Sequence, residues 1–158
     1  MNMHTDDPTP LVEAVFRDIQ AQRMDGLSML NPALRVQAVG FARRETPHAE
    51  WLGVLVTPWS MGLMLLPAGA DWPATASHER AFREYPAGTF AFLPNQEAGL
   101  GDYLICPLFH EMSQFADQAT AVMTAQASLL ALQMAPAQPA AAAVPEQPGR
   151  RKFLTLGS

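Results

Sequence analysis

Apolar residues near the start of the chain recur every three or four positions, the spacing of one face of a helix. The residues concerned are Leu11, Val12, Val15, Phe16 and Ile19. Pro10 suits the first turn of a helix and Gly26 suits its end, so we expect a helix over residues 9–24. From Leu34 to about Phe41, apolar residues alternate with polar ones instead, which predicts a strand.

Two apolar runs in the middle of the chain, residues 51–57 and 61–66, predict two further strands. The segment TPWS at their junction has the composition of a turn, so the two strands should form a hairpin. Residues 75–84 are compatible with a short helix. Apolar residues return in residues 88–93 and 102–108, which predict two more strands separated by a loop.

A long final helix is expected over residues 114–134, with Ser113 as its cap and with apolar residues on one side. Those apolar residues are Phe115, Ala119, Val122, Met123, Leu129, Leu130 and Met134. A helix, a series of strands with short connections and a second helix indicate the α+β class. We therefore expect a mainly antiparallel sheet of about five strands with an N-terminal and a long C-terminal helix, followed by a flexible tail.

The composition changes after residue 134. Residues 135–148 hold six Ala, four Pro and a single charged residue. Frequent Pro prevents a stable helix, so this segment has the character of a linker. Residues 149–158 form a short basic tail. The sequence thus predicts a single folded domain over residues 1–134, an Ala/Pro-rich linker and a tail.

Charge is unevenly divided between these parts. Residues 1–134 hold seven Lys or Arg and fourteen Asp or Glu, a net charge of −7, whereas the rest of the chain carries +2. An acidic body suits a basic peptide and does not suit nucleic acid, whose phosphates require clustered positive charge. No apolar run reaches about 18 residues, and the N-terminus lacks the basic and apolar parts of a secretion signal. We therefore expect a cytoplasmic protein without stable membrane insertion.

Side chains that carry out chemistry are scattered along the sequence. The four His residues stand singly, without metal-ligand spacing, and Ser60 lies outside any nucleophile-elbow pattern. The one cysteine, Cys106, precedes Pro107 in an apolar run, which favours a buried structural thiol over a reactive one. The sequence therefore predicts no catalytic residue, no metal ligand and no cofactor, and so a protein that is not an enzyme.

Aromatic and methionine side chains gather around the predicted hairpin, within residues 51–72. Trp supplies a large contact area and Met adapts to varied apolar partners, so these residues are candidates for protein binding. The partner-binding residues that we predict here are Pro58, Trp59, Met61 and Trp72. The alternative is that such residues belong to the core, and Trp59 is the best candidate for an exposed anchor because it lies at the turn.

The tail contains the order Arg-Arg-x-Phe-Leu, which resembles the core of a twin-arginine export signal. A working export signal is N-terminal and precedes an apolar stretch, so we do not expect this segment to export the chain. We assign Arg150, Arg151, Phe153 and Leu154 to partner binding, and we expect this segment to mimic the partner's signal and to compete with it for the acidic body. The alternative is a solvated basic terminus.

Several segments together resemble the HybE family of [NiFe]-hydrogenase assembly chaperones. They are residues 31–41 (NPALRVQAVGF), 51–59 (WLGVLVTPW), 65–67 (LLP), 86–90 (PAGTF), 103–108 (YLICPL) and 150–154 (RRKFL). The resemblance implies an accessory chaperone in [NiFe]-hydrogenase maturation. Its implied partner is the small-subunit precursor with its twin-arginine signal, bound until assembly is complete, with other maturation factors as further candidates.

Some relatives in this family are fused to a rubredoxin domain, but this chain has a single Cys, so we expect no iron here. Two alternatives stay open. Within the hydrogenase setting, the protein could assist or protect iron–sulfur cluster assembly of the small subunit. From another class, it could be a small enzyme with an unrecognised site. Loss of binding when only the partner's two arginines are changed would favour the chaperone.

Overall fold

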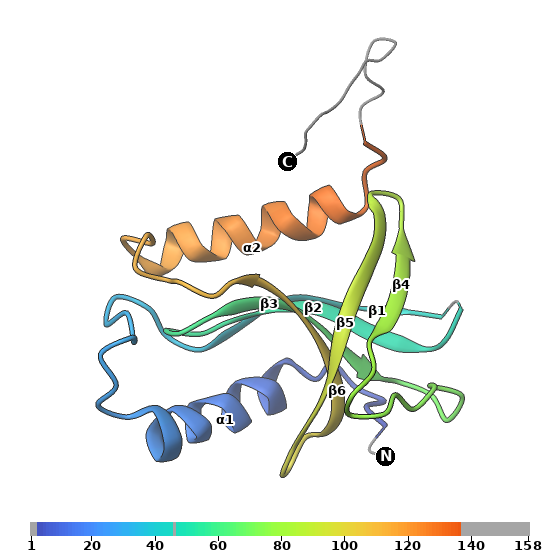
Figure 1. The fold of residues 1–158 in the computed structure, drawn as a ribbon, viewed down its shortest axis with the longest axis horizontal. Coiled ribbons are helices and arrows are strands. Elements are labelled where there is room, and N and C mark those ends of the chain that lie inside the picture. Colours follow the sequence, from blue (N-terminus) through green and yellow to red (C-terminus); the bar gives the residue numbers. More distant parts are fainter. Residues whose placement is uncertain (1–2, 46, 137–158) are drawn as a thin grey trace.

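The computed structural model describes residues 3–45 and 47–136, and Figure 1 shows how they fold. The N-terminal helix α1 (Thr9–Ile19) continues into a π-helical turn, η1 (Gln20–Met24), and the C-terminal helix is α2 (Gln118–Leu132). The strands between them are β1 (Gln37–Arg44), β2 (Glu50–Val56), β3 (Met61–Pro67), β4 (Ala81–Tyr85), β5 (Gly88–Glu97) and β6 (Gly101–Phe109).

These strands form one antiparallel sheet in the order β1-β2-β3-β6-β5-β4. Strands β1 to β3 make one meander and β4 to β6 another, and the two meet where β3 pairs with β6. The predicted α+β class and mainly antiparallel sheet are confirmed, with six strands in place of about five. The hairpin is also confirmed, because β2 pairs with β3 along its whole length.

The two helices cover opposite faces of the curled sheet (Figure 1). On the central strand β3, Leu63 and Leu65 belong to the apolar cluster beneath α2, whereas Met64 and Leu66 belong to the cluster beneath α1. Every residue of β3 is buried, because strand side chains alternate between faces and both faces are covered here.

The expected short helix over residues 75–84 is wrong, because Ala81–Tyr85 is the edge strand β4. Alternate residues of this strand are buried, including Arg83, while Phe82 and Glu84 are exposed. The sequence does not show the apolar–polar alternation of this strand, because one of its buried positions is an Arg. A charged side chain is rarely buried in a protein unless it is paired.

Helix α2 begins later than expected, and its cap is not Ser113. The Oδ1 atom of Asp117 accepts a hydrogen bond from the backbone N–H of Thr120 at 2.8 Å and caps the helix. The backbone N–H of Ser113 donates to the carboxylate of Glu111, and the chain turns there before the helix starts. The N-terminal part of the predicted helix is therefore a turn.

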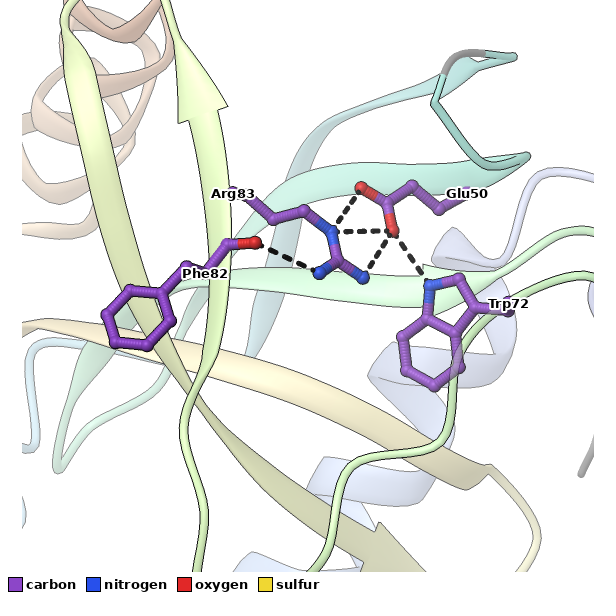
Figure 2. A network of polar contacts seen from close by, with 4 residues as sticks. All are labelled: Glu50, Trp72, Phe82 and Arg83. Atoms are coloured by element: carbon purple, nitrogen blue, oxygen red, sulfur yellow. Dashed lines mark hydrogen bonds and ion pairs between the residues drawn. The ribbon is translucent and has the colours of Figure 1, made fainter.

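A buried polar network joins β2 to β4 and is shown in Figure 2. Arg83 Nη2 lies 3.2 Å from Glu50 Oε1, and Trp72 Nε1 donates to the same oxygen at 2.7 Å. Nearby, the guanidinium of Arg44 on β1 lies 4.6 Å from the ring centre of Tyr85 on β4. Because β1 and β4 are the two edges of the sheet, these contacts mean that the sheet curls until its edges approach one another.

Candidate partner-binding groove

A cavity of about 300 Å³ opens on the α1 side of the sheet, next to the last turn of α1. Its apolar walls come from α1, from the β2–β3 hairpin and from β6. The apolar side chains that define it are Phe16, Ile19, Leu55, Trp59, Ile105 and Pro107. We call this cavity the α1 groove.

The α1 groove is open in part because Gly62, which lines it from β3, carries no side chain. Gly62 on β3 pairs with Pro107 on β6, and the register of the two strands shifts beside this pair. Pro cannot donate to the hydrogen-bond ladder and is typical of such irregular points. A Cβ atom at Gly62 would lie 3.1 Å from both the carbonyl oxygen of Cys106 and the side chain of Ile105. A larger residue at Gly62 would therefore crowd the groove.

The polar residues that line the groove are Ser60 at the hairpin turn, Asn95 and Glu97 on β5, Tyr103 on β6, and His110 just after β6. Of the described residues that line the groove, Glu97 alone carries a carboxylate. Its Oε1 accepts a hydrogen bond from Arg23 Nη2 at 2.6 Å. Burial raises the pKa of Tyr103, and the negative charge of Glu97 adds to this shift, so the phenol stays protonated at neutral pH. The groove thus combines an apolar surface with one acidic group.

Trp59 and Met61, two of the residues predicted to bind a partner, line this groove. Trp59 is half-buried at the hairpin turn, where its backbone N–H donates to the hydroxyl of Thr57 at 3.2 Å. The Met61 side chain is 1% exposed and belongs to the cluster beneath α2. Pro58 is buried beside Trp59, and its carbonyl oxygen accepts from the backbone N–H of Asn31 at 2.9 Å.

Trp72, which was also predicted to bind a partner, does not line the groove. Trp72 is 5% exposed, belongs to the core beneath α2 and donates to Glu50. The remaining four lie outside the described residues, as does the rest of the linker and tail beyond residue 136. They are Arg150, Arg151, Phe153 and Leu154.

Cys106 is half-buried on β6, and burial raises the pKa of its thiol. Within residues 3–45 and 47–136, no group of three or more His, Cys, Asp or Glu side chains could hold a metal ion. In the same part of the chain, no helix has the length and apolar character needed to cross a membrane.

A family model described as "[NiFe]-hydrogenase assembly, chaperone, HybE" matches residues 7–156. The chain belongs to the HybE family. It is thus an accessory chaperone of [NiFe]-hydrogenase maturation, as the resemblance of its sequence segments implied.

Curated relatives agree with membership of the HybE family, and a solved structure shows the same fold. The chain is 38% identical over 120 residues to "Probable rubredoxin HupJ" of Rhodobacter capsulatus, covering 75% of this chain but only 42% of that protein. It is 36% identical over 149 residues to "Hydrogenase expression/formation protein HupJ" of Bradyrhizobium diazoefficiens, covering 91% and 85%. The solution structure of HybE from Escherichia coli has the same fold, with a TM-score of 0.67 at 24% identity over 96% of this chain and 95% of that one.

Most of the α1 groove in this HybE family member is invisible in the sequence. Glu97 falls in the loop expected before the last predicted strand, whereas β5 extends to it as Gly88–Glu97. The spacing of Phe16 and Ile19 indicates only the apolar side of a helix and not a binding surface. They meet Trp59 because α1 lies across the sheet, and no local spacing specifies that arrangement. The one visible signal is an aromatic residue at a turn.

Proposed function

We propose that this HybE family member binds the precursor of the [NiFe]-hydrogenase small subunit in the cytoplasm, through its twin-arginine signal, until assembly is complete. The proposed role is binding and not catalysis. The observation that carries the proposal is the α1 groove, whose apolar walls and single carboxylate match the chemistry of an Arg-Arg-x-Phe-Leu segment.

The apolar part of the signal has a matching surface in the groove. Trp59, Ile105 and Pro107 offer wall contacts for the Phe and Leu side chains. A volume of about 300 Å³ is at the lower end of ligand cavities in general, so it suits a few side chains and not a folded domain. Burial of apolar area at about 25 cal/mol per Å² then supplies most of the affinity.

The arginines of the signal have a weaker but directional role. An exposed ion pair is worth only about 0–1 kcal/mol, so Glu97 alone cannot hold the peptide. The net charge of −7 on residues 1–134 speeds and orients the approach of a basic peptide, and this effect weakens in high salt.

The test is a titration of the full chain against a fluorescent peptide that carries Ser-Arg-Arg-x-Phe-Leu-Lys, followed by anisotropy. We expect saturable binding, weaker binding when the two arginines become lysines, and a larger loss when Phe and Leu become alanines. A peptide of the same composition in scrambled order is the control. Equal affinity for all four peptides, or none for the signal, would contradict the proposal.

A second measurement separates the signal from the folded subunit as the bound species. The chaperone is used to capture the small subunit from cells that make it either with or without its signal segment. We expect retention only of the precursor with the signal. Equal retention of both forms would mean that the folded subunit is recognised instead.

A further inference from the structure

Arg23 reaches Glu97 from the π-helical turn that ends the N-terminal helix. Arg23 Nη2 and Glu97 Oε1 are 2.6 Å apart, although the residues are 74 positions apart in the chain. A π-helical turn is rare and shifts the side chains that follow it relative to a regular helix. Arg23 is thereby the residue that links η1 (Gln20–Met24) to the end of β5.

Glu97 stands at the junction of two depressions. One is the α1 groove, and the other is a shallow depression of about 510 Å³ along α1 and η1, which Arg23 also lines. Arg23 lines this second depression and not the α1 groove, so it reaches the carboxylate from the side of α1 and η1. Its own side chain is 57% exposed, while that of Glu97 is 20% exposed. The carboxylate is thus largely covered, whereas the guanidinium beside it is mostly solvated.

We propose that Arg23 is a resident occupant of the position that a partner's arginine takes on Glu97, and that the two guanidiniums exchange when the peptide binds. This inference rests on the function proposed above. An arginine that enters through the groove lays its apolar stem along Ile105, which lines the groove but not the depression that Arg23 lines. The incoming residue therefore wins the exchange, and Arg23 moves into solvent.

The resident arginine also determines which peptides bear the cost of opening the pair of Arg23 and Glu97. A peptide without an arginine in register must leave the pair of Arg23 and Glu97 intact, and it gains only apolar contacts. A lysine offers a compact ammonium without the planar fork that pairs with a carboxylate. Arg23 thus weakens the binding only of peptides that must displace it, and Glu97, once vacated, still favours an arginine over a lysine.

The experiment compares Arg23→Gln with Arg17→Gln in the same anisotropy titration of the Arg-Arg peptide. Arg17 is a matched control, because it pairs with Glu13 on the same helix with side-chain exposures of 59% and 19%, and it does not line the groove. Both variants change the net charge equally. We expect Arg23→Gln to bind the peptide up to about fivefold tighter and Arg17→Gln to bind it as the wild type does.

The double variant Arg23→Gln, Glu97→Gln isolates the exchange. It is compared with the single variant Glu97→Gln. If Arg23 acts only through Glu97, loss of Arg23 should have no effect once the carboxylate is gone, so the single and the double variant should bind the peptide equally weakly. Arg23→Lys serves as a second variant in case the Gln variant loses its fold, and it should give an intermediate affinity.

The outcomes separate the two proposals. If neither the wild type nor any variant binds the peptide, both the proposed function and this inference are wrong. Binding by the wild type with unchanged or weaker affinity for Arg23→Gln and Arg23→Lys overturns the inference and leaves the proposed function standing. An equal gain in Arg17→Gln would mean that net charge, and not the exchange on Glu97, sets the affinity.

Discussion

The hydroxyl of Thr57 fixes the turn that carries Trp59. It accepts hydrogen bonds from the backbone N–H groups of Trp59 and Ser60 at 3.2 and 2.9 Å. The backbone N–H of Thr57 in turn donates to the carbonyl of Ser60 at 2.9 Å. These bonds hold the turn without the indole ring. The ring can therefore serve the groove, and its removal should leave the turn intact.

We expect Trp59→Ala to weaken binding of the twin-arginine peptide by about 2 kcal/mol, since aromatic anchors often dominate an interface. The measurement is the anisotropy titration, with thermal unfolding followed in parallel. Phe82→Ala is the control, because Phe82 is 62% exposed on β4 and does not line the groove. A collapse of the fold in Trp59→Ala would instead make Trp59 a core residue.

At the scale of the element, α2 depends on its Asp117 cap and on pH. Hydrogen bonds from Thr120 lower the pKa of Asp117 from its ordinary value of 3.8. A lowered pKa in the folded state means stabilisation that is complete above the unfolded value and is lost as pH falls through the folded value. Asp117→Ala should therefore lower the unfolding temperature at pH 7, and the difference should shrink at a pH below 3.8. A difference that stays constant with pH would show that the charge is irrelevant.

The buried pair of Glu50 and Arg83 makes a second element-scale prediction. Glu50→Gln keeps an acceptor for Trp72 but leaves the guanidinium of Arg83 buried without a counter-charge. We expect a loss of about 3–5 kcal/mol in urea unfolding, and a similar loss for Arg83→Met. The double variant Glu50→Met, Arg83→Met should be less destabilised than either single variant. Additive losses would contradict the coupling.

The elements also show what the sequence could and could not specify. The helix α1 and the hairpin of β2 and β3 follow from local spacing and from one turn, so they were predictable. The strand β4 was not, because the partner that makes Arg83 tolerable inside lies 33 residues away. The groove depends in the same way on Glu97, Trp59 and α1 meeting across the sheet. Contacts between residues far apart in the sequence produce no local periodicity, so they could not be predicted from it.

At the scale of the whole molecule, the described core ends with α2. Leu132 is 3% exposed and belongs to the cluster beneath α2, whereas residues 133–136 are exposed. We therefore expect a chain cut after residue 134 to unfold cooperatively at nearly the same temperature as the full chain, as measured by calorimetry. A large drop in that temperature would mean that residues beyond 134 belong to the core.

The basic tail leads to a further whole-molecule prediction. Arg150, Arg151, Phe153 and Leu154 repeat the order of the peptide that we propose as the ligand. The composition of residues 135–148 predicts a linker, and a random coil of 14 residues spans about 20 Å on average, short enough to keep the tail concentrated near the body. Deletion of residues 149–158 should thus tighten peptide binding, with a smaller gain at high salt. Weaker binding after deletion would mean that the tail helps to hold the partner.

The pair of Glu50 and Arg83 also limits how this protein can change over evolutionary time. Each residue alone is costly to replace, whereas a joint replacement by apolar residues of similar size is often tolerated. A lineage that loses one charge is therefore selected either to regain it or to lose the other soon afterwards. Among descendants of a common ancestor, these two positions should be inherited as a unit, although they lie on strands that are not neighbours in the sheet.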